Sequence, residues 1–196
     1  TVTFEIQQSV WKRLFIHWGD GSTNLFTPTG FGIQTVSKLI DNNITKTTLK
    51  MPCFDHVITF RIIEQTCIAW DISKFTNLID VWFDKIGSTP HVSFNGLEKL
   101  SSIKMKNMPI QTIEFGYMPA IQIIDFTSCE LNEAAIESFL LQIWNQRKMI
   151  LGTPIITVTG NPGIGSITAI SNDIINGTGA YVDEGLVSGY GYTVNL

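Results

Sequence analysis

A glycine-rich turn at residues 155–166, IITVTGNPGIGS, is the first place where this chain could do chemistry. A glycine-rich turn after an apolar strand can hold a phosphate through its backbone N–H groups. A Walker-type phosphate loop also needs a lysine, and residues 160–166 read G-N-P-G-I-G-S without one. The glycines at 160, 163 and 165 also miss the G-x-G-x-x-G spacing of dinucleotide-binding folds. We therefore expect a structural turn and no nucleotide.

Paired carboxylates are the second possible chemistry. Asp80 and Asp84 lie four residues apart, which on one face of a strand separates them by about 13 Å. That is wider than the carboxylate pairs of glycosidases. Asp20 alone is far short of the oxygen ligands that calcium requires. These patterns predict a chain that is not an enzyme and holds no metal.

Histidine and cysteine add no catalytic pattern. The histidines are His17, His56 and His91, and the cysteines are Cys53, Cys67 and Cys129. They form no zinc spacing, no C-x-x-C motif and no nucleophile motif of a known kind. We interpret the cysteines as small buried hydrophobic residues and expect no cofactor.

The composition favours strands over solvated helices and gives no basic field. The 196 residues carry a formal net charge of -4, with 44% hydrophobic and 15% charged residues. This charge argues against nucleic acid as a partner. No apolar stretch is long enough to cross a membrane, so we expect no membrane insertion.

A repeat of 21 or 22 residues organises the middle of the chain. Each unit carries apolar residues at offsets 0, 3 and 5, and a second apolar row follows with gaps of two and three. The first row is Val57, Phe60, Ile62; Leu78, Val81, Phe83; Leu100, Ile103, Met105; and Ile121, Ile124, Phe126. The second row is Trp70, Ile72, Phe75; Val92, Phe94, Leu97; and Ile113, Phe115, Met118. Short strands of this kind bury their apolar side chains by stacking on one another.

The unit L-x-x-L-x-L-x-x-N-x-L resembles the leucine-rich repeat, from about Val36 to Leu196. The chain departs from that pattern at the ninth position, where Gln65, Ile86, Met108 and Cys129 replace asparagine. Only Asn161 stands in the family's place. The resemblance implies a β-rich α/β solenoid, a leucine-rich-repeat array with a parallel sheet, an N-terminal β-hairpin cap and a C-terminal helix and strand cap.

The two ends of the chain differ from the repeats. Alternating apolar residues around Asp20-Gly21 predict a hairpin, and "IHWGDGST" resembles a segment of PKD-like β-sandwich domains. Residues 131–151 predict a helix with Asn132 as N-cap and Gly152 as its end, and we expect a short helix near residues 180–187 and a strand at residues 192–196. We expect a cap at residues 1–35, the repeat array at 36–165 and a second cap at 166–196.

On each strand of the predicted sheet, the side chains at offsets 2, 4 and 6 point away from the apolar rows. The expected binding residues on this concave face are Arg61, Asp80, Trp82, Asp84, Lys104, Lys106 and Asp125. Two readings stay open: the charges are ladder pairs between neighbouring strands, or Trp82 between two cations is the centre of a binding site.

These observations indicate a non-enzymatic interaction module that acts in adhesion or assembly. Segments such as W-G-D-G-S and the final "GYGYTVNL" look like modules of bacterial surface proteins and bacteriophage structural proteins. By that resemblance we expect an extracellular, cell-surface or virion location, with a protein, a cell-surface glycan or sister chains as partner. The alternatives are a carbohydrate-binding or carbohydrate-active domain and a purely architectural spacer in a fibre.

Overall fold

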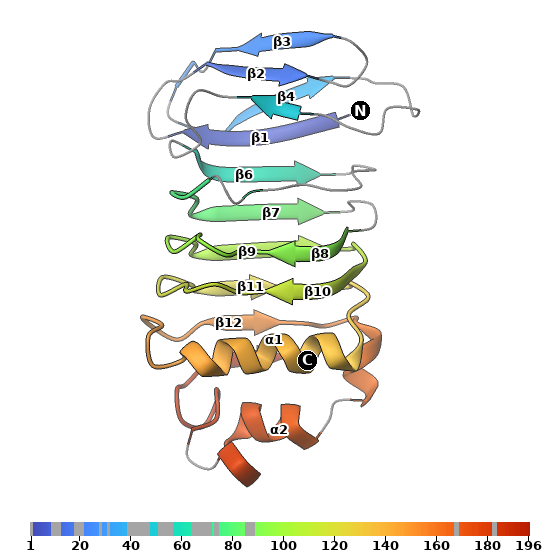
Figure 1. Cartoon of the computed structure of the whole chain (residues 1–196), viewed down its shortest axis with the longest axis vertical. Coiled ribbons are helices and arrows are strands. Elements are labelled where there is room, and N and C mark those ends of the chain that lie inside the picture. Colours follow the sequence, from blue (N-terminus) through green and yellow to red (C-terminus); the bar gives the residue numbers. More distant parts are fainter. Residues whose placement is uncertain are drawn as a thin grey trace.

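A computed structural model describes residues 2–8, 13–17, 22–27, 29–30, 32–38, 48–50, 57–63, 72, 75–84, 89–166, 169–181 and 184–196. Its largest element is a sheet of eight strands in the order β13-β12-β11-β9-β7-β6-β1-β4. These are β1 (Val2–Gln8), β4 (Gln34–Lys38), β6 (Val57–Ile63), β7 (Asp80–Asp84), β9 (Ser102–Lys106), β11 (Ile123–Asp125), β12 (Ile155–Thr157) and β13 (Thr193–Asn195). We call it the main sheet. Its strands follow one another along the long axis of the molecule (Figure 1).

From β6 to β13 the strands are parallel and pair at like positions of the repeat. Phe60 pairs with Val81, Phe83 with Met105, and Ile103 with Ile124. Ile124 in turn pairs with Ile156 on the next strand. The pairing that the period predicts is therefore confirmed over these strands.

The predicted fold class, a leucine-rich-repeat array, is wrong. The main sheet is mixed, because β1 pairs antiparallel with both β4 and β6. Val36, which we expected in a first repeat unit, lies on β4 and is separated from β6 by β1. The described residues contain only two α-helices, α1 (Glu133–Gln146) and α2 (Ala169–Asn176). The 21-residue period predicts which positions pair between neighbouring strands. It does not predict the direction of the strands at the chain start, or whether a helix or a strand connects one repeat strand to the next.

A second layer covers one side of the main sheet. It contains a three-stranded antiparallel sheet of β2 (Leu14–His17), β3 (Thr23–Phe26) and β5 (Thr48–Lys50), and a parallel pair of β8 (Thr89–Ser93) and β10 (Ile110–Glu114). In Figure 1, β8, β10 and α1 lie in front of β9, β11 and β12. The second apolar row of the repeat belongs to this layer: Val92 and Ile113 lie on β8 and β10, and Phe94 and Phe115 follow these strands directly.

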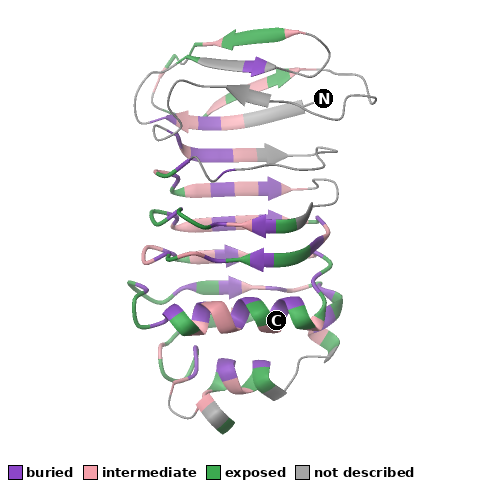
Figure 2. Ribbon diagram, in the orientation of Figure 1, coloured by how far each residue is buried: buried purple, intermediate pink, exposed green. Residues whose placement is uncertain are grey.

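Aromatic side chains join the two layers. Phe115, which follows β10, contacts Phe126, which follows β11, with ring centroids 6.1 Å apart. Phe139 of α1 contacts both of them, at 6.0 and 5.7 Å. These rings are buried in one continuous core, and the buried residues of α1 lie toward the sheets (Figure 2).

The helix predicted after Asn132 is confirmed in position but not in length. The Asn132 side chain accepts a hydrogen bond from the Ala135 N–H at 2.9 Å, as an N-cap should. The helix ends at Gln146, before the predicted stop at Gly152. The short helix expected near residues 180–187 is wrong, because the described helices in this part are α2 and two 3-10 helices, Pro162–Ser166 and Gly179–Tyr181.

The turn at Asn161 is structural. Its buried side chain accepts hydrogen bonds from the N–H groups of Cys129 and Leu131 at 2.8 and 3.0 Å. It donates to the carbonyl oxygens of Phe126 and Val158 at 2.7 and 2.6 Å. All the hydrogen-bonding capacity of the carboxamide is thus used inside the chain.

Candidate binding surface

The side of the main sheet opposite the second layer is formed by every other residue of its strands. Among the described residues no helix or strand covers it, and its side chains on β7 and β9 are half-buried against one another. We call this surface the outer face. On the strands that carry its charges, the members whose side chains are described are Glu5, Gln7, Thr59, Arg61, Asp80, Trp82, Asp84, Ser102, Lys104, Lys106, Ile123 and Asp125.

Trp82 lies in the middle of this surface between two cations. The guanidinium carbon of Arg61 is 5.2 Å from the centroid of the indole ring, and Nζ of Lys104 is 5.8 Å from it. Their positions follow from the strand register, in which Arg61, Trp82 and Lys104 are direct neighbours. The indole Nε1 is buried and has no hydrogen-bond partner among the described residues.

Arg61 holds three neighbouring strands of the outer face together. Its Nε and Nη2 donate to Oδ2 of Asp80 at 3.0 and 2.9 Å, while Nη1 lies 3.6 Å from a carboxylate oxygen of Glu5. The three side chains come from β6, β7 and β1. Glu5 was not predicted from the sequence, because β1 lies outside the 21-residue repeat and its position beside β6 cannot be inferred from that period.

The other charges of the outer face are paired differently from the prediction. The ladder interpretation of the sequence pairs Asp84 with Lys106 and Lys104 with Asp125, and the strand register does place the members of each pair side by side. The ion pair, however, joins Lys106 to Asp125 at 2.7 Å. Asp84 accepts a hydrogen bond from the Asn107 side chain at 2.8 Å. Lys104 contacts the Trp82 ring instead of a carboxylate.

The structure therefore brings together all the predicted binding residues: Arg61, Asp80, Trp82, Asp84, Lys104, Lys106 and Asp125. Most of their charges are satisfied within the sheet, as in the ladder interpretation. Trp82 and Lys104 are the exception. Within the described part of the chain, the Trp82 ring contacts the Arg61 guanidinium and the Lys104 ammonium group, and that ammonium group has no carboxylate partner. The centre of the outer face is thus the part best suited to bind a partner.

The described residues give the outer face no catalytic arrangement. Asp80 is tied to Arg61 and Asp84 to Asn107. Within the described part of the chain, no three histidine, cysteine or acidic side chains are grouped as metal ligands. None of the helices described there is long and apolar enough to cross a membrane.

No protein-family model, curated protein or solved structure matches this chain. The W-G-D-G segment at residues 18–21 that suggested a PKD-like hairpin lies outside the described residues, as do Cys53, Cys67 and His56.

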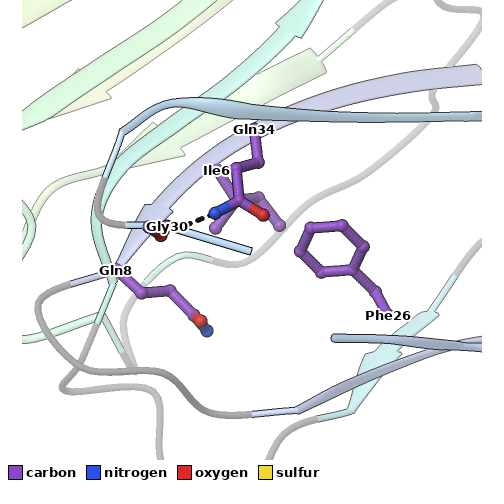
Figure 3. Close-up of a pocket in the computed structure, with 5 residues that line it drawn as sticks. All are labelled: Ile6, Gln8, Phe26, Gly30 and Gln34. Carbon is purple, nitrogen blue, oxygen red and sulfur yellow. Dashed lines mark hydrogen bonds between the residues drawn. The ribbon is translucent and has the colours of Figure 1, made fainter. Parts of the chain in front are cut away.

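A small pocket lies between the two layers near the chain start (Figure 3). It is lined by Ile6, Gln8, Phe26, Gly30 and Gln34, is partly open to solvent and leaves no room for a water molecule. Nε2 of Gln34 donates to the carbonyl oxygen of Gly30 at 2.6 Å. Gln8 is 4% exposed, yet neither polar atom of its carboxamide has a hydrogen-bond partner among the described residues. Such a group costs stability unless something pairs with it.

A cation cluster joins α1 to the chain end. The Arg147 guanidinium stacks 3.5 Å from the centroid of the Trp144 ring and pairs with Glu184. Trp144 Nε1 donates to the Glu184 carbonyl oxygen at 2.8 Å. A hydrogen bond from Lys148 holds the pKa of the exposed Glu184 carboxyl below its usual value. This cluster docks the last segment and leaves no open ring face comparable with Trp82.

Cys129 has no features of a reactive thiol. It is fully buried, and its Sγ lies 2.9 Å from the carbonyl oxygen of Met105. Burial raises the pKa of this thiol to about 12. The expectation of a small buried hydrophobic residue is confirmed for Cys129.

Proposed function

We propose that this chain is a non-enzymatic interaction module that binds its partner through the outer face and acts in adhesion or assembly. The observation that carries the proposal is Trp82, a half-buried indole between two cations at the centre of a sheet face that no described helix or strand covers. Tryptophan and arginine side chains at the centre of a surface dominate binding energies at protein interfaces.

A rigid surface also suits binding. The side chains of the outer face lie on paired strands. Two ion pairs, Arg61 with Asp80 and Lys106 with Asp125, hold them in place. These side chains therefore lose little conformational entropy on binding. The partner class that we propose is a protein or a surface glycan. The extracellular, cell-surface or virion setting is supported by the W-G-D-G-S and "GYGYTVNL" segments.

The experiment is a titration followed at the tryptophan indole N–H signals. The chain has 5 tryptophans, and Trp82→Phe assigns the signal of Trp82. The probes are neutral and acidic glycan fragments and the unlabelled chain itself. We expect the Trp82 signal to shift in a saturable way with at least one probe, while the Trp144 signal stays fixed. Shifts confined to other tryptophans would refute the outer face as the binding surface.

A further inference from the structure

The arrangement of charges on the outer face is complementary to itself. In the strand order, β7 and β9 are adjacent strands near the middle of the sheet, with three strands on either side. On the outer face β7 carries the carboxylates of Asp80 and Asp84, whereas β9 carries the ammonium groups of Lys104 and Lys106. One half of the central strip is therefore acidic and the other half basic.

We infer that the partner of the outer face is the same face of a second copy of this chain, related by a two-fold axis that runs parallel to the strands between β7 and β9. This inference rests on the proposed function and specifies its partner. A closed two-fold contact is the commonest way in which identical chains associate.

The axis places β7 of one copy over β9 of the other, at the register that already exists within the sheet. Asp84 then lies opposite the partner's Lys106, and Trp82 opposite the partner's Lys104. Each of these contacts occurs twice, because the interface is isologous. The contact between an indole ring and an ammonium group is attractive, and so is the contact between a carboxylate and an ammonium group.

The next strands outward are also compatible. The same axis places β6 over β11, which sets Arg61 opposite the partner's Asp125. It places β1 over β12, which sets Glu5 opposite the partner's Thr157. No pair of like charges is brought into direct opposition on the described strands.

The other face-to-face arrangement fails on the same residues. A two-fold axis across the strands, at the level of Trp82, would lay every strand on its own copy. Arg61, Lys104 and Asp125 would then each face themselves, and Asp80 would face the partner's Asp84. Like charges in direct opposition across an interface are strongly repulsive. Charge thus selects one of the two arrangements, with the strands of both sheets aligned.

The size of the face predicts a weak dimer. The main sheet has eight strands and its central strands have 5 residues, so at a spacing of about 4.8 Å and a rise of about 3.3 Å the face covers about 630 Å² at most on each copy. The total over both copies is about 1,300 Å² at most, which lies at the low end of specific interfaces. The contact is mostly polar, so we expect micromolar association that weakens as salt rises.

Sedimentation velocity over a range from low micromolar to several hundred micromolar tests the inference. The variants are Asp84→Lys and Lys106→Asp, with Glu98→Lys, an exposed site on a turn outside the strands, as matched control. We expect a concentration-dependent dimer for the native chain, at least tenfold weaker association for either outer-face variant, and little change for the control.

An equimolar mixture of the two outer-face variants gives the sharpest result. In a mixed dimer the two substituted positions would face each other with opposite charges, and the unchanged Asp84 of one copy would face the unchanged Lys106 of the other. The mixture should therefore regain association that neither variant has alone. Lost folding in one variant cannot produce this recovery. A native chain that stays monomeric, or a mixture that does not recover, overturns the inference. If glycan still shifts the Trp82 indole signal, the proposed function stands while the dimer falls.

Discussion

The side chain of Gln142 hydrogen-bonds to the backbone of Phe115 as a neighbouring strand would. Its Oε1 accepts from the Phe115 N–H at 2.8 Å, and its Nε2 donates to the carbonyl oxygen of Ile113 at 2.9 Å. One turn later, Gln146 accepts from the Met118 N–H at 3.1 Å. Helix α1 thereby satisfies the edge of the β8–β10 sheet and closes it to further strands.

Replacing Gln142 tests this closing contact. Gln142→Leu should lower the free energy of unfolding by about 1–3 kcal/mol, because it leaves a buried N–H without a partner. Asn145→Ala, at an exposed position on the same helix, should change it by less than about 0.5 kcal/mol. Chemical denaturation followed by circular dichroism measures both. Equal stabilities would show that water replaces the side chain.

The Asn161 turn offers two glycines for comparison. A Cβ atom at Gly163 would lie 2.4 Å from the backbone of Asn132, whereas a Cβ at Gly165 would meet nothing within 4 Å. Gly163→Ala should therefore destabilise the chain by about 1–3 kcal/mol or more, and Gly165→Ala should be nearly neutral. Thermal unfolding distinguishes them. Two equally tolerated substitutions would contradict the close packing of this turn on the start of α1.

Replacing Gln8 with an apolar residue should increase the stability of the chain. Because both polar atoms of its buried carboxamide are unpaired among the described residues, Gln8→Leu should raise the free energy of unfolding by about 1–3 kcal/mol. Gln34→Leu is the control: it removes the hydrogen bonds to Gly30 and Thr29, and it should destabilise the chain. Chemical denaturation of the two variants beside the native chain measures the difference. A destabilised Gln8→Leu variant would mean that a partner satisfies the carboxamide in solution.

Alkaline pH should weaken the fold through Cys129. The pKa of this thiol rises from 9.0 to about 12 on folding, so above pH 9 the unfolded chain releases a proton that the folded chain retains. Its contribution to stability is complete below pH 9 and is lost as pH rises from 9 to 12. Denaturation at successive pH values should therefore show a shallower decline for Cys129→Ala than for the native chain. Parallel curves would exclude a buried thiol.

The stacking of the strands could be predicted from the sequence, but the antiparallel direction of β1 at the N-terminal end of the main sheet could not. Like positions such as Phe83 and Met105 pair because each unit places its apolar row at the same height. The insertion of β1 between β4 and β6 depends on contacts between residues far apart in the chain, for which no local pattern exists. The second apolar row was visible, but its fold as a parallel pair of strands, β8 and β10, was not.

The binding residues were predicted to share a face because their row follows from the strand register. Their detailed contacts were not, since Asp84 and Asp125 have the same side chain and the rotamer of Lys106 decides which of them it reaches. Gln142 and Gln8 could not be recognised in advance, because a glutamine carries no signal of whether its amide is paired. The pair of Arg147 and Glu184 escaped for a similar reason: the two meet only after α1 and the chain end pack together.

Oxidative footprinting of Trp82 and Tyr117, in the free chain and in the chain bound to its partner, tests most directly the claim that the outer face is the binding surface. The reference residue is Tyr117, which is 47% exposed and follows β10 in the second layer. We expect Trp82 to be oxidised in the free chain and protected at least fivefold in the bound chain, while Tyr117 reacts equally in both. Protection of Tyr117 with unchanged oxidation of Trp82 would contradict the account.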